Sequence, residues 1–329
     1  MIVYSRTNIR TWSMLGTCGA FGIAATELPS MDDRIVFLTS DLCFYSGLER
    51  FAAQYGDRLY NFGIAEQNMV GAAAGFAKEG FVPFATTYGA FAASRCMDQV
   101  RVNMGYMGLN VKIVGLTSGL TSGILGATHI SVEDLAVMRA IPNLTILSPA
   151  DGAETIKAVL AAAAYEGPIY LRLTGSMGCP IVYSEEPPFV IGKANPLAAG
   201  EDIAILATGS VVAAAQRAAV LLRQQGVSAS VLDFHTIKPL DTQAISSCMS
   251  TKMIVTVEEH NVYGGFGSAV AEHLSTYRSH PPQLFIGIDD RFQKADEYND
   301  LLSEYGLTAE QIANKIIKRL EESYHYDQS

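Results

Sequence analysis

One carboxylate lies in a stretch of the sequence that is otherwise almost without charge. Glu66 belongs to the segment 61–75, which reads NFGIAEQNMVGAAAG. A glutamate in such a setting either finds a partner or stays protonated, because burial disfavours its charged form and raises its pKa. A neutral carboxylic acid in an apolar pocket can donate a hydrogen bond at neutral pH, which is useful in catalysis. The small residues from Gly71 to Gly75 are expected to let another element approach closely.

Four further residues combine reactive or aromatic side chains with a place after a strand-like run or in a glycine-containing loop. Asp41 follows the run 34–39, and ligands bind beyond the carboxyl ends of strands in open parallel sheets, although a role as a helix N-cap or in a turn is commoner for aspartate. Tyr88 and Phe91 follow a second run. They can pack in a core or contact a bound heteroaromatic ring, for about 1 kcal/mol each. His129 lies in a loop and is either structural or a binding and proton-transfer group.

Ordered motifs extend along nearly the whole chain. After the segment 61–75 come ATTYGAF (85–91), MDQVR (97–101), RAIPN (139–143), SPAD (148–151), HTIKPLD (235–241) and EEH (258–260). In these motifs the chain resembles the C-terminal half of transketolases, which are thiamine-diphosphate enzymes. The resemblance is greatest to split transketolases, in which this half is a separate subunit.

The resemblance implies roles for particular residues. Glu66 would bond the N1′ nitrogen of the cofactor's aminopyrimidine and favour the imino tautomer that activates the cofactor. Asp41 and Ile64 would lie at the cofactor, and Tyr88 and Phe91 would line the pyrimidine pocket. The loop histidine, His129, would contact hydroxyl groups of the donor substrate and share the catalytic role with Glu66.

The expected substrate site departs from the family pattern. Arg10 remains, but the family's phosphate-binding loop histidine is replaced by Thr117, and its arginine falls among residues 174–176, which carry no positive charge. A family serine aligns with Tyr45. Losing charge-assisted bonds to a phosphate is a large change, since each is worth about 1.5–3 kcal/mol.

The loop before the histidine departs as well. Ile124 and Leu125 stand where the family carries acidic residues, one of which contacts a sugar hydroxyl. Leucine cannot accept a hydrogen bond, so Leu125 would line a less polar substrate channel. The expected substrate therefore lacks a phosphate or carries fewer hydroxyl groups than an ordinary sugar phosphate.

The motif that holds the cofactor's Mg²⁺ and diphosphate is missing. In the family, GDG followed by an asparagine lies in the N-terminal half, and no GDG occurs here. We expect thiamine diphosphate and Mg²⁺ to be held mainly by a partner subunit that carries this motif, with no metal ligand from this chain. An α2β2 heterotetramer is the expected assembly.

The expected function is transfer of a two-carbon ketol unit from a ketose donor to an aldehyde acceptor. Two related alternatives are a 2-oxoacid-decarboxylating β-subunit and an enzyme like deoxyxylulose-phosphate synthase, whose corresponding half has the same domain order. A third alternative is a non-catalytic subunit that only binds a partner.

Composition excludes several other classes. The 329 residues carry a net charge of −10, with a pI near 5.1, so neither nucleic acid nor an anionic membrane is an expected partner. The five cysteines lack CxxC spacing and fit reduced thiols in the cytoplasm. The apolar run 12–25 after Arg6 and Arg10 could pass for a signal peptide, but a buried first helix is the favoured interpretation.

The elements that must position these residues alternate between strand-like and helical patterns. Alternation of this kind predicts an α/β protein with two doubly wound, mainly parallel sheets. The predicted units are a pyrimidine-binding domain over 1–175, a linker over 176–200 and a transketolase C-terminal-type domain over 201–329. The sequence GGFG at 264–267 is weakly similar to a phosphate loop, but a tight turn is favoured.

Overall fold

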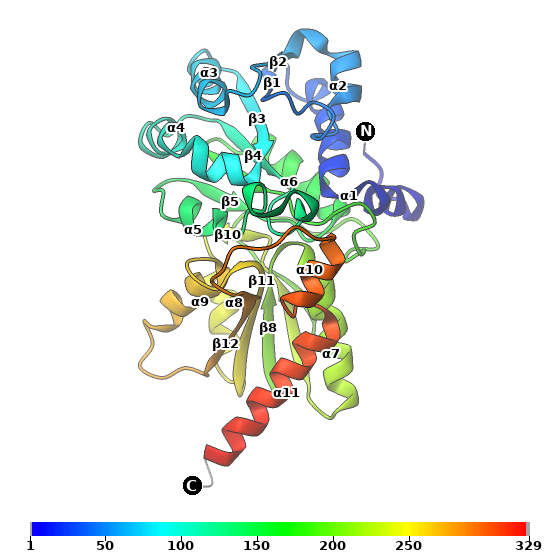
Figure 1. Cartoon of the computed structure of the whole chain (residues 1–329), viewed down its shortest axis with the longest axis vertical. Coiled ribbons are helices and arrows are strands. Elements are labelled where there is room, and N and C mark those ends of the chain that lie inside the picture. The colour runs from blue at the N-terminus through cyan, green and yellow to red at the C-terminus, as the bar shows by residue number, and fades with distance from the viewer. Residues whose placement is uncertain (1, 327–329) are drawn as a thin grey trace.

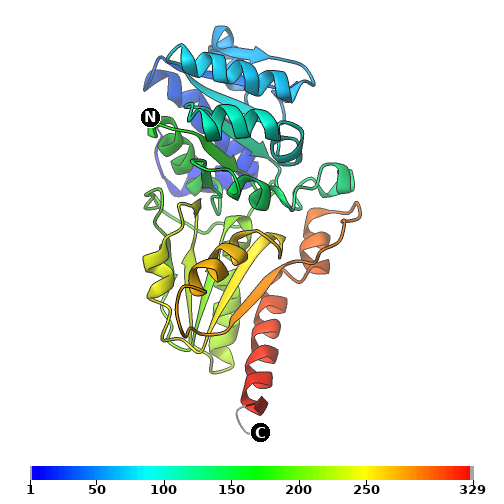
Figure 2. The same ribbon diagram turned by 90° about the vertical axis from the view of Figure 1, so that its left-hand side faces the viewer.

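The computed structural model describes residues 2–326 and contains two sheets flanked by helices (Figures 1 and 2). This confirms the predicted α/β class. The first sheet lies in the half of the molecule that holds the N-terminus. The second lies below it in Figure 1, with the last helix running along its side.

The first sheet has seven strands in the order β10-β5-β6-β4-β3-β1-β2. Its strands are β1 (Ile35–Thr39), β2 (Leu59–Asn61), β3 (Val82–Tyr88), β4 (Lys112–Leu116), β5 (Thr145–Leu147), β6 (Ile169–Arg172) and β10 (Thr236–Lys238). All pairs are parallel except β10 with β5. The central strands β1 and β4 are buried along their whole length, as expected when helices cover both faces of a parallel sheet.

The helices of this half are α1 (Arg6–Glu27), α2 (Glu49–Gln54), α3 (Glu66–Lys78), α4 (Met97–Gln99), α5 (Asp134–Arg139) and α6 (Gly152–Ala164). Two π-helical turns, Phe91–Arg95 and Val100–Tyr106, flank α4. The segment weighed as a signal peptide is part of α1, with Trp12 and Phe21 buried. The helix breaks at Gly16, whose φ is 71° and where a Cβ would lie 2.8 Å from the carbonyl oxygen of Ser176.

The second sheet has five strands in the order β12-β11-β8-β9-β7. They are β7 (Asn195–Ala198), β8 (Ile203–Ala207), β9 (Ala229–Asp233), β11 (Met253–Asn261) and β12 (Gln283–Ile288), and only β7 is antiparallel to its neighbour. The helices are α7 (Val212–Gln224), α8 (Thr242–Ser246), α9 (Phe266–Leu274), α10 (Tyr298–Glu304) and α11 (Ala309–Tyr326).

Two elements cross the expected domain limits. The stretch predicted as a linker, 176–200, contains no helix or strand from 176 to 194, and β7, which follows, pairs with β9 of the second sheet. Strand β10 belongs by position to the second unit, yet it pairs with β5 and closes one edge of the first sheet. Covering an edge strand satisfies its backbone groups and protects it from aggregation.

Two further segments noted in the sequence have distinct surroundings. The backbone N–H groups of Phe266 and Gly267 in the GGFG segment donate to the Glu258 carboxylate at 2.6 and 2.8 Å, so an internal anion fills this helix start. Burial raises the pKa of that carboxyl to about 7. On α3, Gly71 and Gly75 face open space, and none of the described residues packs closely against them.

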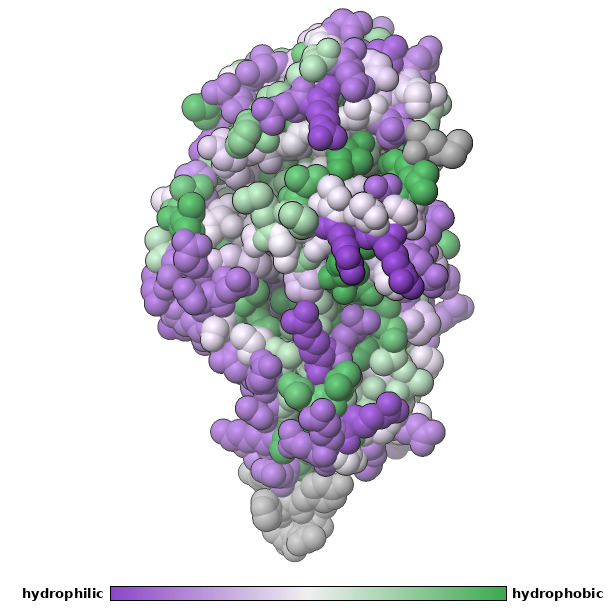
Figure 3. Space-filling view, turned by 90° about the vertical axis from the view of Figure 1, so that its right-hand side faces the viewer, coloured by the Kyte–Doolittle hydropathy of each residue, from purple (hydrophilic) through white to green (hydrophobic). Residues whose placement is uncertain are grey.

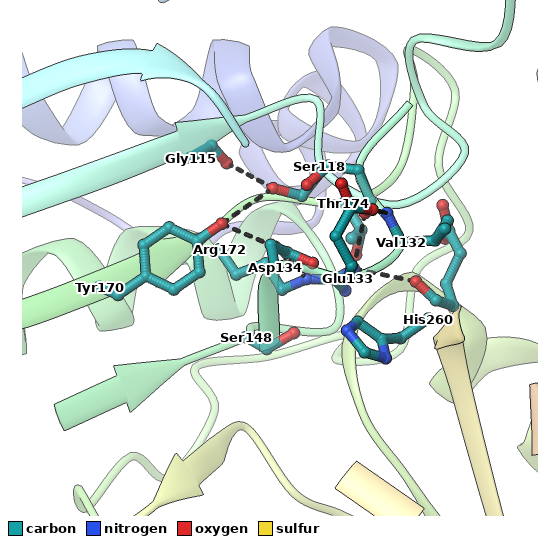
Figure 4. A network of polar contacts seen from close by, with 12 residues as sticks. Gly115, Ser118, Val132, Glu133, Asp134, Ser148, Tyr170, Arg172, Thr174 and His260 are labelled. Atoms are coloured by element: carbon teal, nitrogen blue, oxygen red, sulfur yellow. Dashed lines mark hydrogen bonds and ion pairs between the residues drawn. The ribbon is translucent and has the colours of Figure 1, made fainter. Parts of the chain in front are cut away.

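A buried polar network joins the two halves (Figure 4). Arg172 donates through Nε to Asp134 at 2.8 Å and through Nη2 to the backbone oxygen of Glu259 on β11 at 2.9 Å. Asp134 also accepts from the Tyr170 hydroxyl at 2.6 Å. The Glu259 side chain in turn accepts from the backbone N–H of Leu120 at 2.6 Å. These contacts fix the second sheet against the end of the first.

The outer surface is mixed. On the face shown in Figure 3, hydrophobic side chains occur in patches between hydrophilic ones. Within residues 2–326, every helix is too short or too polar to cross a bilayer.

Candidate active site

The predicted site residues gather at the carboxyl ends of strands in the first sheet. Asp41 follows β1, Tyr88 ends β3, and Thr117 follows β4. Glu66 is the first residue of α3, which begins soon after β2. These strands are parallel neighbours in the order β4-β3-β1-β2, so their ends meet at one edge, the place where open α/β sheets bind ligands.

Glu66 is buried and ion-paired. Its side chain is 2% exposed, and both of its oxygens accept from Nη1 of Arg95, at 2.8 and 2.9 Å. The Arg95 side chain is 43% exposed. Of the two outcomes considered from the sequence, the glutamate has found a partner, and its surroundings are not free of charge.

Arg95 comes from a π-helical turn that also presents Phe91. The backbone N–H of Cys96 donates to the carbonyl oxygen of Phe91, five residues earlier, at 3.3 Å. The guanidinium carbon of Arg95 lies 4.0 Å from the centre of the Phe91 ring. Turns of this kind interrupt α-helices mostly at functional sites. The turn therefore brings a cation and an aromatic face together beside Glu66.

A chain of ring contacts continues from Phe91. The His129 ring lies 5.2 Å from Phe91 and 5.5 Å from Tyr88, and Tyr88 lies 5.9 Å from Phe91, all edge-on. Tyr45, aligned with a family serine, lies 6.3 Å from Tyr88. Burial raises the pKa of Tyr88, so its hydroxyl is neutral near pH 7. The structure thus brings together Glu66, Tyr88, Phe91 and His129, as expected.

Tight packing holds Tyr88 in place. A Cβ on Gly89 would lie 2.1 Å from the Ser118 hydroxyl oxygen, so a larger residue here would push the ends of β3 and β4 apart. The loop segment Gly123–Thr128 precedes His129 and turns at Gly126, whose φ is 68°. The hydroxyl of Thr128 and Nδ1 of His129 are 2.9 Å apart, which restrains the imidazole.

Asp41 is tied to the motif that contains Glu66. Its backbone N–H donates to Oδ1 of Asn61 at 3.0 Å, and the amide of Asn61 donates to the Asp41 carboxylate at 3.2 Å. Asp41 has a positive φ of 60°, which is uncommon for a residue other than glycine. It caps no helix, so the N-cap alternative is wrong, and its side chain braces the turn before Glu66.

The other predicted residues lie at the rim or apart. Ile64 is 78% exposed, and Leu125 and Ile124 are 45% and 67% exposed. The Thr117 hydroxyl pairs with Ser122 at 2.7 Å. Arg10 is exposed on α1, and no described contact joins it to the cluster.

The residues present fit the aminopyrimidine end of thiamine diphosphate. A flat, polar heteroaromatic ring needs an acid at its edge and aromatic surface beside it, and Glu66, Tyr88 and Phe91 supply these. The described residues contain no group of three histidine, cysteine, aspartate or glutamate side chains that could hold a metal ion.

Arg95 is the site residue that the sequence reasoning missed. The hydroxyl of Ser94 donates to the Ala90 carbonyl oxygen at 2.5 Å. The arginine is the next residue. A basic residue four positions after Phe91 in a helical segment was the available signal, because residues so spaced lie on one side of a helix.

Two family models match the chain. The model for the transketolase pyrimidine-binding domain covers residues 13–179, and that for the transketolase C-terminal domain covers residues 192–312.

Relatives match over most of their length. A putative transketolase C-terminal section from Methanocaldococcus jannaschii is 39% identical over 302 residues, covering 91% of this chain and 95% of that protein. A 6-deoxy-6-sulfo-D-fructose transketolase subunit, SqwH, from a Clostridium species is 42% identical over 287 residues, covering 87% of this chain and 88% of that protein. A solved split-gene transketolase, described as an inactive β4 tetramer, superposes with a TM-score of 0.83 at 39% identity, covering 92% of this chain and 97% of that one.

Proposed function

The chain belongs to the transketolase family, and from this premise we propose that it is the C-terminal subunit of a two-subunit transketolase-like enzyme. The proposed reaction transfers a two-carbon ketol unit from a ketose-type donor to an aldehyde-type acceptor. The observation that carries the proposal is the buried carboxylate of Glu66, held beside Phe91, Tyr88 and His129 at the carboxyl edge of a parallel sheet.

Each of these residues has a task in the proposed site. When bound, thiamine diphosphate supplies the carbon nucleophile that breaks and forms the carbon–carbon bond. Glu66 holds or moves a proton at the ring's N1′ edge. Tyr88 and Phe91 fix the ring's plane, and His129, between both aromatics and the loop, binds and protonates substrate oxygen.

A partner subunit completes the site in this proposal. Ile64, next to the pocket, is 78% exposed, and the α3 positions Gly71 and Gly75 face open space. Such small and apolar surface suits close contact with a second chain. The partner would hold the diphosphate and Mg²⁺, in an α2β2 assembly in the cytoplasm.

The rim favours a substrate that is not an ordinary sugar phosphate. Exposed apolar or aromatic side chains, Tyr45, Ile124 and Leu125, occupy positions that carry serine and acids in the family. Thr117 and residues 174–176 provide no cation for a phosphate. One relative is named as a transketolase subunit for 6-deoxy-6-sulfo-D-fructose, a ketose that carries a sulfo group, which supports an atypical substrate.

Reconstitution tests the function directly. The chain would be mixed with an N-terminal-half transketolase subunit, thiamine diphosphate and Mg²⁺, and ketol transfer followed with a panel of unphosphorylated, sulfonated and phosphorylated ketoses. We expect transfer only when both chains are present, with the phosphorylated sugars as poor substrates. Turnover of xylulose and ribose phosphates at the rate of an ordinary transketolase would contradict the substrate proposal.

The same reconstituted complex distinguishes the proposed ketol transfer from the alternative functions. Release of carbon dioxide from pyruvate would identify a 2-oxoacid or deoxyxylulose-phosphate-synthase type of reaction, which the apolar Ile124–Leu125 loop would also tolerate. Activity of the complex that survives Glu66→Ala would identify a non-catalytic, partner-binding subunit.

A further inference from the structure

The guanidinium of Arg95 makes two contacts that the proposed site would offer to the pyrimidine ring. It is a flat, delocalised group that donates N–H bonds, and it lies 4.0 Å from the centre of the Phe91 ring. Its Nη1 atom donates to both oxygens of Glu66, at 2.8 and 2.9 Å. An aminopyrimidine with a proton on N1′ would need the same carboxylate and the same aromatic side chain.

We propose that Arg95 occupies the pyrimidine position in the free subunit, so that cofactor binding has to displace it from Glu66 and Phe91. This inference rests on the proposed function, because it assumes that the cofactor ring binds at Glu66. It adds Arg95, which was expected neither among the cofactor-binding residues nor among the substrate-binding residues, as a residue that governs cofactor affinity.

The burial of the two partners supports displacement of the arginine rather than movement of the acid. Glu66 is 2% exposed and lies at the start of α3, whereas the Arg95 side chain is 43% exposed. Arg95 has no other ion pair among the described residues, since its contacts are with Glu66 and Phe91. A half-exposed arginine can regain water when it leaves, while a buried carboxylate cannot.

Displacement has a measurable consequence for affinity. If the binding-competent state, with Arg95 swung out, is only partly populated, the apparent dissociation constant rises in inverse proportion to that population. Removing the guanidinium removes the competitor. Binding of the cofactor by the reconstituted complex should therefore become tighter, by roughly threefold to tenfold. A residue that merely braces the pocket would give weaker binding when removed.

The test compares thiamine diphosphate binding, with Mg²⁺ present, to the complex reconstituted from wild-type chain and from Arg95→Met. Methionine is unbranched and apolar like the stem of arginine, but it cannot donate to Glu66. Arg223→Met, which removes an exposed arginine from α7 in the other half, is the matched control and should leave the dissociation constant unchanged. Tighter binding in Arg95→Met alone supports the proposal, and equal or weaker binding overturns it.

A second comparison keeps the test valid if Arg95→Met folds poorly. In a Glu66→Gln background the buried carboxylate is absent. The double variant Glu66→Gln/Arg95→Met therefore leaves no buried carboxylate without its cation, which was the reason for expecting poor folding. The affinity gain from removing Arg95 should shrink in this background, because its charged anchor is gone. An undiminished gain would contradict competition at Glu66. Failure of the proposed function looks different, since the wild-type complex would then bind no cofactor or would bind it without regard to Glu66.

Discussion

The chain contains two guanidinium–carboxylate pairs with the same separation and different surroundings. Arg172 and Asp134, at the junction of the two halves, are 2.8 Å apart and 0% exposed, and Asp134 also accepts from the Tyr170 hydroxyl. Arg95 and Glu66 are likewise 2.8 Å apart, but the arginine is 43% exposed, and its remaining N–H groups have no described partner.

The contrast separates a structural pair from one that is free to change. The interior pair is embedded in hydrogen bonds that reach β11, so neither member can leave without opening the junction between the sheets (Figure 4). The pair at the sheet edge has one buried and one solvated member, and the solvated one can exchange for a ligand. Distance alone does not distinguish the two; exposure and the number of additional bonds do.

The largest expected effect is on the interior pair. Arg172→Met should lower the free energy of unfolding by about 3–5 kcal/mol, because it leaves the Asp134 charge buried without its cation. Chemical denaturation monitored by circular dichroism measures the change. A loss below about 1 kcal/mol, the range of a surface pair, would remove the distinction between the two pairs.

The same pair has a pH signature. Burial acts to raise the pKa of Asp134, but the Arg172 guanidinium and its hydrogen bond outweigh this and hold the pKa below its usual value. Its contribution is therefore present above the unfolded-state pKa and lost as the pH falls through the lower folded-state pKa. In Arg172→Met burial is opposed mainly by the hydrogen bond from the Tyr170 hydroxyl, so the Asp134 pKa should rise and acidification from neutral pH should destabilise the variant less than wild type. An unchanged profile would contradict this.

The next largest effect is catalytic. Glu66→Gln should lower ketol transfer by the reconstituted complex by roughly 100-fold, because the amide cannot hold or move the proton at the ring's edge. The amide keeps the shape of the side chain and its carbonyl oxygen can still accept from Arg95, so the unfolding midpoint should stay near that of wild type. Activity within twofold of wild type would exclude Glu66 from the chemistry.

A smaller effect is expected on specificity. Leu125→Asp places a carboxylate at the half-exposed rim position where the family carries an acid. It should shift the ratio of kcat/KM values towards substrates with more hydroxyl groups by about tenfold, the value of one hydrogen bond of moderate strength. Competition between two ketoses that differ by one hydroxyl measures the ratio. No shift would place Leu125 outside the substrate channel.

The smallest effect is on the stability of the edge pair. Arg95→Met should lower the free energy of unfolding of the free chain by about 1–2 kcal/mol, because solvent screens a pair whose arginine is half exposed, although the buried Glu66 carboxylate loses its cation. The fall should be several times smaller than that of Arg172→Met in the same assay. Equal losses would mean that both pairs serve the fold.

Local pattern was sufficient for much of the site. Continuous apolar runs predicted the central strands, and the polar or aromatic residues after them, Asp41 and Tyr88, lie at the carboxyl edge. The proximity of Glu66, Phe91 and His129 followed from the family motifs. These signals depend on neighbouring residues in the chain, which is why they can be read from the sequence.

What could not be predicted depends on distant contacts. Strand β10 is three residues long, and its place in the first sheet is fixed by pairing with β5, about 90 residues earlier in the chain. Arg95 was missed because its ion pair with Glu66 joins two segments that are 29 residues apart in the chain, and neither segment indicates the pair by itself.

The most direct test of the claim that this chain supplies one part of a shared cofactor site is a calorimetric titration of thiamine diphosphate with Mg²⁺. It would be made into this chain alone, into an N-terminal-half transketolase subunit alone, and into their mixture, with Glu66→Gln as the matched variant. We predict tight binding only in the mixture, weakened by Glu66→Gln. Tight binding by this chain alone, or binding by the mixture that does not depend on Glu66, would contradict the account.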